Sequence, residues 1–414
     1  MQGSKSGRVI GVLVVALWLI LGHNAPAGRA DTPLPSCGSE DRRGLLYVSP
    51  TFSEDRTLFL KTGTWDQTVF LRSTDGGLSW AEVVYPGGTD VTYGVYFSPH
   101  YAQNQTLYAT YDGPSGRLDR STDGGRSWMT LTAPRTSAIT FPDMAVYDAD
   151  TLFLSYGRGQ PGGYSEQGLF YSTDGGRTWE HRFVGGVAAV ALSPNYAQDA
   201  TILVSPVAYH ADGGVFKSTD RGLTWQPSRE GLRWGGDGAT HQISFSPDYI
   251  HNHTVFCASL WGLYKSTDAG GHWASIDEPL DPSHGPSRPV FALSPRYSQD
   301  HTLWVYGYPG GKLARSTDGG VTWRWLPAEI TPIAASEVCR AGGDCRVILF
   351  GQDRNVQNYK SFDGGDTWQC LEEPDAPPPT PEPSSVPEIP EAATWLLLAG
   401  GLAGLTGYLW RKKR

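Results

Sequence analysis

The stretch Ser172-Thr-Asp-Gly-Gly-Arg-Thr-Trp179 decides the fold, because its pattern Ser-x-Asp-x-Gly-x-x-Trp occurs seven times in the chain. We call this octet the box. The seven boxes begin at Ser73, Ser121, Ser172, Ser218, Ser266, Ser316 and Ser361, with 45 to 51 residues from one to the next. A repeat of this length is one supersecondary unit, which must stack on copies of itself to bury its apolar face. The repeat therefore predicts an architecture, but by itself it predicts no activity.

Each repeat predicts four short strands. In the sixth repeat they cover residues 290–294, 302–307, 312–316 and 322–326, with Pro, Gly and Asp between them. Seven such units predict an all-β fold, a seven-bladed β-propeller of four-stranded antiparallel blades over residues 44–373. The 51 glycines, 12% aromatic residues and 18% charged residues suit short strands joined by tight turns. We expect the ring to be monomeric.

The box is predicted to be the turn between the third and fourth strands of its blade. Its Asp can accept backbone N–H bonds within the turn, and its second Gly suits a residue with positive φ. The Trp opens the fourth strand and can bury a large area between sheets. These structural residues are Asp75, Asp123, Asp174, Asp220, Asp268, Asp318 and Asp363, with Trp80, Trp128, Trp179, Trp225, Trp273, Trp323 and Trp368.

A second element recurs between the first and second strands, with the pattern Ser-Pro-x-aromatic-x-x-Asp/Asn-x-Thr. We call it the Ser-Pro turn. It begins at Ser49, Ser98, Ser193, Ser246 and Ser294, is loose in the third repeat and is missing from the seventh. Each copy offers one carboxylate or amide rather than a cluster, so we expect turn capping and no metal site.

Residues that break the repeat are the candidates for function. The box and the Ser-Pro turn should share one face, so the other loops form the opposite, variable face, where loops on a rigid scaffold carry binding residues. Aromatic and acidic residues there suit a sugar or a peptide, although ordinary solvated turns would look similar. The ligand-binding candidates are Trp65, Asp66, Tyr111, Asp112, Arg158, Glu166, His210, Asp212, Trp234, Asp237, His241, Trp261, Tyr308, Asp353 and Arg354.

Catalysis is not assigned by any motif. Glycosidases need two carboxylates at a defined separation, and nothing in the sequence selects a pair among the candidates. The chain has no HExxH, GxSxG or phosphate-binding loop, and no cofactor is predicted. The net charge of −9 argues against a nucleic-acid partner, which normally requires a basic surface.

Both ends of the chain carry targeting features. Residues 1–30 read as a signal peptide, with Lys5 and Arg8 before an apolar run from Val9 to Leu21, and residues 31–43 lead into the ring. Residues 374–391 form a Pro/Glu-rich linker, residues 392–410 are long and apolar enough for a transmembrane helix, and residues 411–414 are basic. The basic end should stay cytoplasmic, which places the ring on the extracytoplasmic side of the membrane.

An exported chain permits disulfides among its five cysteines. If the ring closes, Cys37 and Cys370 meet and can be bridged, and Cys339 can pair with Cys345 across a short loop. Cys257 lies in a strand-like run and should be a buried thiol. Connectivity is not fixed by the sequence alone.

The octet is identified as the Asp-box, or BNR repeat, of sialidases, sortilin-type receptors, xyloglucanase-type glycosidases and photosystem II assembly-factor propellers. The resemblance implies a structural box on the face opposite the ligand. One box per blade over seven blades is most similar to the assembly factors, which bind proteins and catalyse nothing. Their basic patch is not evident here, and the Arg of the sialidase motif is missing at Phe141-Pro142-Asp143.

The C-terminus resembles a PEP-CTERM sorting signal at Val386-Pro387-Glu388, although Ile389 stands where that signal has Pro. Taken together, the sequence predicts a membrane-tethered propeller that binds a protein or glycan through its variable face. The alternatives are an Asp-box-type glycoside hydrolase, sialidase-like or xyloglucanase-like, and a mainly structural envelope protein.

Overall fold

The computed structural model describes residues 34–37, 43–64, 67–83, 91–112, 117–134, 142–156, 168–207, 213–233, 240–277, 288–307, 311–339 and 345–373. The predicted signal peptide, linker, transmembrane helix and basic end lie outside these residues. No helix in the described part of the chain is long and apolar enough to cross a membrane.

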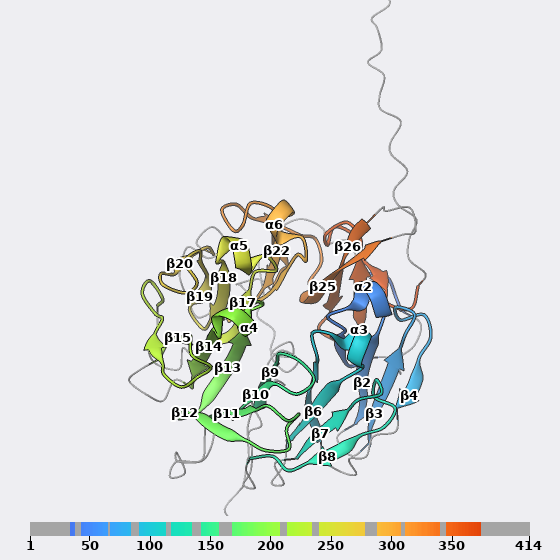
Figure 1. Cartoon of the computed structure of the whole chain (residues 1–414). Helices are drawn as coiled ribbons and strands as arrows, with labels where there is room; N and C mark the ends of the chain where they lie inside the picture. Colours follow the sequence, from blue (N-terminus) through green and yellow to red (C-terminus); the bar gives the residue numbers. More distant parts are fainter. Residues whose placement is uncertain are drawn as a thin grey trace, which may run out of the picture. The chain divides into compact units, whose positions relative to one another are not determined.

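The described residues form seven four-stranded antiparallel sheets, each built from consecutive strands, and the sheets are arranged in a ring (Figure 1). This confirms the predicted seven-bladed propeller. Blade 1 contains β1 (Leu45–Val48), β2 (Leu58–Thr64), β3 (Gln67–Ser73) and β4 (Ala81–Val83). Blade 2 contains β5 (Val91–Phe97), β6 (Leu107–Asp112), β7 (Leu118–Ser121) and β8 (Met129–Leu131). Blade 3 contains β9 (Pro142–Val146), β10 (Leu152–Tyr156), β11 (Gly168–Ser172) and β12 (Glu180–Val184).

The other four blades follow the same order, from an innermost first strand to an outermost fourth strand. Blade 4 contains β13 (Val187–Leu192), β14 (Ile202–Pro206), β15 (Phe216–Ser218) and β16 (Gln226–Pro227). Blade 5 contains β17 (Thr240–Phe245), β18 (Val255–Ser259), β19 (Gly262–Ser266) and β20 (Ala274–Ser275). Blade 6 contains β21 (Val290–Leu293), β22 (Leu303–Tyr306), β23 (Ala314–Ser316) and β24 (Arg324–Trp325). Blade 7 contains β25 (Thr331–Cys339), β26 (Cys345–Gln352), β27 (Asn358–Ser361) and β28 (Gln369–Cys370).

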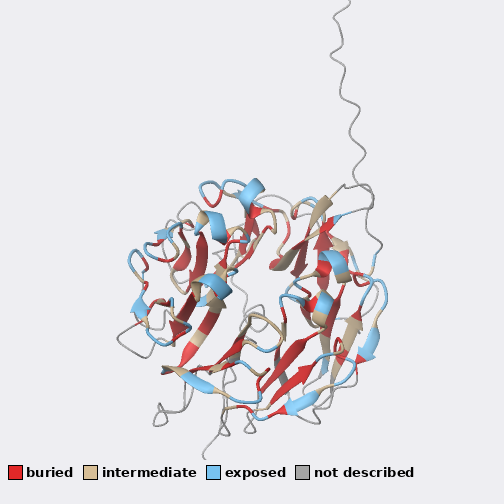
Figure 2. Ribbon diagram, in the orientation of Figure 1, coloured by how far each residue is buried: buried red, intermediate tan, exposed pale blue. Residues whose placement is uncertain are grey.

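The core lies between the blades rather than at one centre. Seven hydrophobic clusters of described residues each join two neighbouring blades, and one of them joins blade 7 to blade 1. Each cluster includes the box Trp of one of its two blades, as the sequence predicts. Figure 2 shows the buried residues concentrated in the strands of the blades. Every blade therefore depends on both neighbours for burial of its apolar surface.

The ring closes without exchanging a strand, because blades 1 and 7 each consist of one continuous segment. The ring of Phe52 packs edge-on against that of Phe350, with centroids 5.1 Å apart. The N–H of Gly44 donates to the carbonyl of Val356 at 3.0 Å. The predicted Cys37–Cys370 and Cys339–Cys345 disulfides are both present, and Cys257 is a buried free thiol.

All seven boxes share one hydrogen-bond pattern. The Ser Oγ donates to Asp Oδ1 at 2.7 to 2.9 Å and accepts the N–H of the fifth residue, while the N–H of the seventh residue donates to the same Asp oxygen. His272 replaces the usual Ser or Thr at the seventh position, and its Nδ1 lies 2.7 Å from Asp268 Oδ2. The predicted turn role of the Asp is confirmed.

The fourth box position is more constrained than its sequence suggests. It has positive φ in every copy, including the two copies that carry Arg221 (64°) and Ala269 (59°). A non-glycine residue in this left-handed region is strained because its Cβ approaches the following carbonyl oxygen.

The Ser-Pro turns fold into one-turn helices among the described residues. These are α2 (Phe52–Asp55), α3 (Tyr101–Asn104), α4 (Tyr196–Asp199), α5 (Tyr249–Asn252) and α6 (Tyr297–Asp300). The last residue of each helix caps its turn: Asp300 Oδ2, for example, accepts from Ser294 Oγ at 2.7 Å, and its Oδ1 accepts from the N–H of Thr302 at 2.8 Å. This confirms turn capping for the recurrent Asp and Asn residues.

Candidate functional site

The box and the Ser-Pro turn lie on one face of the ring, as predicted. In blade 6 the N–H of Gly319, the fourth box residue, donates to the carbonyl of His301, which directly follows α6, at 3.0 Å. Ala269 makes the same bond to His253 in blade 5, at 2.8 Å. The loops between second and third strands, and those between blades, consequently lie on the variable face.

Ten of the fifteen ligand-binding candidates lie wholly or partly outside the described residues. For Asp112 the structure describes only the backbone, at the end of β6, and the other nine fall in undescribed segments. They are Trp65, Asp66, Arg158, Glu166, His210, Asp212, Trp234, Asp237 and Tyr308. The described side chains among the candidates are those of Tyr111, His241, Trp261, Asp353 and Arg354.

Tyr111 is built into blade 2. Its side chain is buried, and its hydroxyl donates to Asp119 Oδ2 at 3.0 Å. The Arg117 guanidinium lies over the Tyr111 ring, 5.1 Å from its centroid, and forms an ion pair with the fully buried Asp119 at 2.8 Å. The tyrosine ring is therefore covered by an arginine rather than open to a ligand.

Trp261 has a similar arrangement in blade 5. It lies half-buried in the turn between β18 and β19. The guanidinium of Arg233, an exposed residue from the connection between blades 4 and 5, lies 4.8 Å from its ring centroid. At both described aromatic candidates of the variable face, an arginine covers the ring.

Asp353 and Arg354 occupy the loop between β26 and β27 of blade 7. Asp353 Oδ1 accepts the N–H groups of Asn355 and Gln357 at 2.8 and 2.9 Å, so this carboxylate stabilises its own turn. Arg354 forms an ion pair with Glu329 at 2.8 Å, and its side chain remains 43% exposed. Burial raises the pKa of Tyr306, and the nearby Arg354 guanidinium acts in the opposite direction.

His241 lies at a β-bulge in the innermost strand of blade 5. Its Nε2 is 2.8 Å from the carbonyl oxygen of Pro289 in the connection to blade 6. The neighbouring Gln242 donates to the carbonyl of Phe291 at 2.8 Å and accepts the N–H of the same residue at 3.1 Å. This part of the inner wall therefore joins two blades by side-chain hydrogen bonds.

Asp143 makes a similar link between blades 3 and 4 that the sequence did not single out. Its Oδ2 accepts the N–H of Val190 at 3.0 Å, and its Oδ1 accepts the N–H of Met144 at 2.9 Å. Burial raises the pKa of this carboxyl to about 6, against the effect of those two hydrogen bonds. A raised pKa would suit a general acid, but both oxygens serve the backbone.

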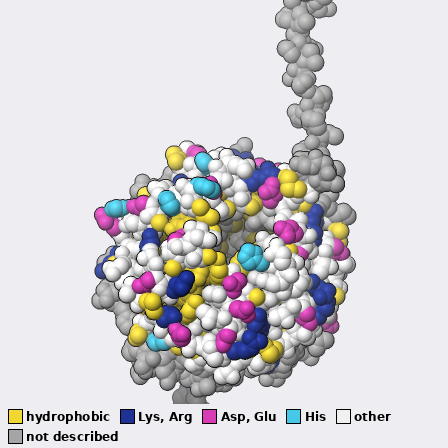
Figure 3. Space-filling view, in the orientation of Figure 1, with side chains coloured by type: hydrophobic (Ala, Val, Ile, Leu, Met, Phe, Trp, Pro, Cys, Tyr) yellow, Lys and Arg dark blue, Asp and Glu magenta, His cyan; other side chains and the backbone are white. Residues whose placement is uncertain are grey.

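Figure 3 shows hydrophobic side chains gathered around the hollow at the middle of the ring.

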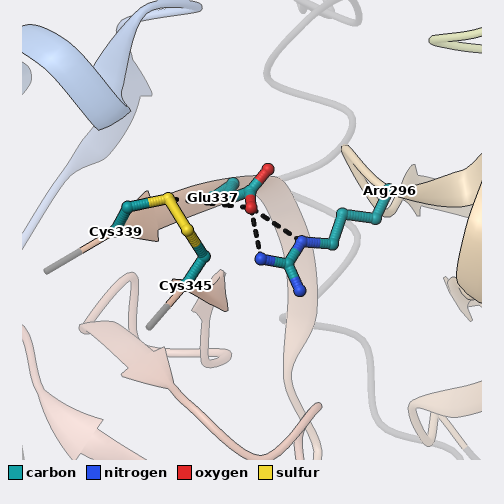
Figure 4. Close-up of a disulfide and its surroundings, with 4 residues drawn as sticks. All are labelled: Arg296, Glu337, Cys339 and Cys345. Atoms are coloured by element: carbon teal, nitrogen blue, oxygen red, sulfur yellow. Dashed lines mark hydrogen bonds and ion pairs between the residues drawn. A yellow bond between two sulfur atoms is a disulfide. The ribbon is translucent and has the colours of Figure 1, made fainter. Parts of the chain in front are cut away.

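The hairpin of β25 and β26 differs from its counterparts because blade 7 lacks a Ser-Pro turn. It carries the Cys339–Cys345 disulfide, and the Arg296 guanidinium of blade 6 donates to Glu337 Oε1 (Figure 4). Glu337, Cys339 and Cys345 are close enough together to hold a metal ion. The two sulfur atoms are bonded to each other, however, so they offer no thiolate ligand.

Sequence reasoning missed a basic residue directly before the box. It is Lys or Arg in six of seven copies, with Tyr171 as the exception. The Nζ of Lys217 donates to the carbonyl of Ala269 at 2.8 Å, and Lys265 and Arg315 donate to Gly319 and Gly364 in the same way. In these three copies the acceptor is the fourth box residue of the next blade, whereas Arg120 donates to the carbonyl of Ala149 and Lys360 to that of Glu373. The six-fold recurrence in the sequence was the available signal.

Comparison with known proteins supports the propeller fold but assigns no activity to this chain. The model of the Sortilin-Vps10 family, described as sortilin, neurotensin receptor 3, matches residues 68–205, which is less than half of the chain. No curated protein matches the chain significantly.

Several solved propellers are similar in structure at low sequence identity. An ancestral GH74 enzyme has a TM-score of 0.56 at 16% identity, over 83% of this chain and 48% of its own. The GH74 enzyme of Niastella koreensis has a TM-score of 0.51 at 16% identity, over 82% of this chain and 67% of its own. YCF48 bound to D1 peptide has a TM-score of 0.49 at 15% identity, over 80% of this chain and 97% of its own. The chain thus spans about half the length of the first of these enzymes. The likenesses to the two GH74 enzymes show a shared propeller fold, and that fold is what the comparisons establish for this chain.

Proposed function

We propose that this chain is an exported, membrane-tethered propeller that binds a protein partner through its variable face. The observation that carries the proposal is the arginine–aromatic contact at the surface of that face, where the exposed Arg233 lies over the half-buried Trp261. A sugar stacks on an open aromatic ring, and here an arginine already lies over the ring of Trp261. Arg, Trp and Tyr are also the residue types that dominate the binding energy of protein interfaces.

The exposed arginine of this contact suits an acidic side chain on the partner. The guanidinium of Arg233 can reach a carboxylate at the surface, whereas that of Arg354 is already paired with Glu329. Guanidinium–carboxylate pairs give direction as well as attraction, because two N–H groups can donate in parallel. We expect the association rate to fall with added salt, as it does for interfaces steered by charge.

The membrane tether rests on sequence alone. The apolar run from Val9 to Leu21 supports export, and the apolar segment 392–410 followed by Arg411–Arg414 supports an anchor with the ring outside. In cells that express the full chain, the ring should resist protease until the outer face of the membrane is made accessible. Full recovery of the chain in the soluble cytoplasmic fraction would contradict this part of the proposal.

The binding proposal is tested by capture of a partner on the full chain. Arg233→Ala and Trp261→Ala should each weaken capture of the same partner, because each removes half of the contact pair. Arg324→Ala is the matched control, since Arg324 is an exposed arginine on the outermost strand of blade 6. Equal loss in the control, or no loss in either variant, would contradict a role for the variable face.

The full chain also tests the alternative that this protein is a glycoside hydrolase. Incubation with xyloglucan and with a panel of sialosides should release no sugar. Sugar release that is lost in Asp212→Asn or Asp237→Asn would replace the binding proposal with a catalytic one.

A further inference from the structure

Each Ser-Pro helix inserts its aromatic side chain into a socket on the preceding blade. At the interface of blades 5 and 6, the Tyr297 ring packs edge-on against Phe256, with centroids 5.2 Å apart. The Lys265 Nζ lies 5.8 Å from the centroid of the same ring. The socket therefore consists of the second-strand residue that pairs with the basic residue before the box, that basic residue itself, and the fourth box residue of the next blade, Gly319.

The same arrangement recurs around the ring. Phe52 packs on Phe350 at 5.1 Å, and Tyr196 packs on Phe153 at 5.9 Å. All five aromatic residues that begin the Ser-Pro helices are at most 4% exposed. They are Phe52, Tyr101, Tyr196, Tyr249 and Tyr297.

Blade 3 fills its socket with backbone instead of an aromatic ring. The loose turn of that blade brings the carbonyl of Ala149 to the hydroxyl of Tyr108 at 2.8 Å and to the guanidinium of Arg120 at 2.9 Å. Six of the seven interfaces are therefore filled by the turn of the following blade.

The interface between blades 6 and 7 is the exception, because blade 7 has no Ser-Pro turn. The equivalent socket residues there are Trp304, Arg315 and Gly364, and all three line a pocket of about 230 Å³. Its wall also contains Val347, Arg346 and Phe362 of blade 7 and the polar residues Asp300, Thr302 and Thr317 of blade 6. A cavity of about 150 Å³ holds a benzene ring, so this pocket is large enough for an aromatic side chain, and its polar wall suits one that carries a hydroxyl group.

Two further departures from the repeat occur beside this pocket. Phe362 stands at the second box position, where the other six boxes have Thr, and the Arg346 guanidinium lies 4.9 Å from its ring centroid. Glu337, the cross-strand neighbour of Val347, is held by Arg296 of blade 6, so an ion pair braces the two blades next to the pocket (Figure 4).

We propose that this socket binds an aromatic side chain presented by a partner protein, in the way that the chain's own Ser-Pro turns fill the equivalent sockets. The occupant is a tyrosine or phenylalanine on a turn, because that group fills five of the other six sockets. Its ring enters the pocket beside Val347 and the stacked Arg346–Phe362 pair. The site lies on the face opposite the variable face and does not depend on the function proposed there.

A peptide copying the chain's own turn, Ser294-Pro-Arg-Tyr-Ser-Gln-Asp300, is the probe. Its binding to the full chain in detergent is followed by fluorescence anisotropy of a dye on the peptide. We expect saturable binding that weakens by about tenfold or more when Tyr297 of the peptide is replaced by Ala. Phe362→Thr in the protein should weaken the native peptide similarly, and because Thr is the residue of the other boxes, this variant should fold. Thr122→Ala changes the same box position at a filled socket and should leave binding unchanged.

A second variant blocks the site rather than removing its wall. Val347→Trp should fill the pocket and abolish binding, with the melting temperature as the check that the ring is intact. The proposal is overturned if the peptide shows no saturable binding up to about 1 mM. It is also overturned if Tyr297→Ala in the peptide or Phe362→Thr in the protein has no effect. If the protein dimerises with rising concentration and Phe362→Thr abolishes the dimer, the occupant of the pocket is a second copy of this chain, and the proposed partner protein is wrong.

Discussion

The Sγ atoms of Cys37 and Cys370 are bonded to each other, although the two residues are 333 positions apart. Cys37 precedes the first strand and Cys370 ends the last one, so the bond ties the segment before blade 1 to blade 7. Since no described strand passes from blade 7 to blade 1, this disulfide is the covalent link that the described residues provide between the two ends of the ring.

Removing this disulfide should destabilise the ring strongly. By the loop-entropy argument, Cys37→Ala with Cys370→Ala should lower the free energy of unfolding by about 6 kcal/mol, because the bond closes a loop with a sequence separation of 333. The Cys339–Cys345 disulfide joins residues only six positions apart in sequence. Its removal by Cys339→Ala with Cys345→Ala should cost about 2 kcal/mol. Urea denaturation of both double variants checks the order. Equal midpoints would show that packing alone closes the ring.

The boxes should make the protein sensitive to acid. Hydrogen bonds from the hydroxyl and backbone N–H of Thr178 lower the pKa of Asp174 to about 2, and Thr224 does the same for Asp220. A carboxyl has a pKa of about 4 in the unfolded chain, so the folded state binds fewer protons between these values. The stabilisation is complete above about pH 4 and is lost as the pH falls towards 2.

Urea midpoints measured from neutral pH downwards test this dependence. Asp174→Asn should be less stable at neutral pH and should lose less stability on acidification than the parent protein. A parent midpoint that stays constant down to the folded pKa would be inconsistent with these hydrogen bonds.

Ala269→Gly should stabilise the protein. Ala269 has φ 59° at a position where five boxes have Gly, and this conformation costs a non-glycine residue about 1–2 kcal/mol. Part of the gain is offset by the freedom that Gly adds to the unfolded chain, which leaves about 0.5–1 kcal/mol.

Urea denaturation, which gives the free energy of unfolding, checks this prediction, and a substitution at the next residue, Gly270, is the control with the opposite expected sign. Gly270 has φ 88°, and a Cβ there would lie 2.8 Å from Ser228 Oγ. Gly270→Ala should therefore destabilise the protein by more than about 1 kcal/mol. Destabilisation by both substitutions would mean that the methyl group of Ala269 makes contacts that outweigh its strain.

Trp273 should be among the most sensitive box residues. It is 4% exposed, and its Nε1 donates to the carbonyl of Ser228 in blade 4 at 2.9 Å. Trp273→Ala should cost about 3–5 kcal/mol, and Trp273→Phe should cost less because most of the buried area remains. Trp325 is 41% exposed on the outermost strand of blade 6, and Trp325→Ala should change stability little. Thermal unfolding of the three variants gives the comparison.

The periodic residues carried most of the fold prediction. The box pattern predicted blade number, strand order and the shared face of the two turns, because each depends on residues that recur. Ring closure gave Cys37–Cys370 as a possible disulfide, and the short spacing of Cys339 and Cys345 gave the other. The clusters between blades were partly predictable, since each box Trp is an apolar residue at a fixed place in its blade. The positive φ of Ala269 and Arg221 was not, because a strained residue is chosen by its surroundings rather than by its own preference.

The candidate site was predictable only as a face. Tyr111 looks like a loop aromatic in the sequence, but Asp119 and Arg117 draw it into the blade. Asp353 looks like a free carboxylate, but its oxygen serves the turn that follows it. Asp143 escaped notice because its role depends on Val190, 47 residues further along the chain. Contacts between blades of this kind depend on three-dimensional neighbours that no local pattern records.

The uninterrupted sheets have a consequence for biosynthesis. Each blade can complete its own hydrogen-bond ladder as soon as its segment has left the ribosome, so the blades can form one after another from the amino-terminal side. Only the contact between the first and last units must wait for the whole chain. Until Cys370 arrives and is oxidised, the nascent protein is an open arc with one uncovered apolar flank at each end, and it is then most exposed to chaperones and proteases.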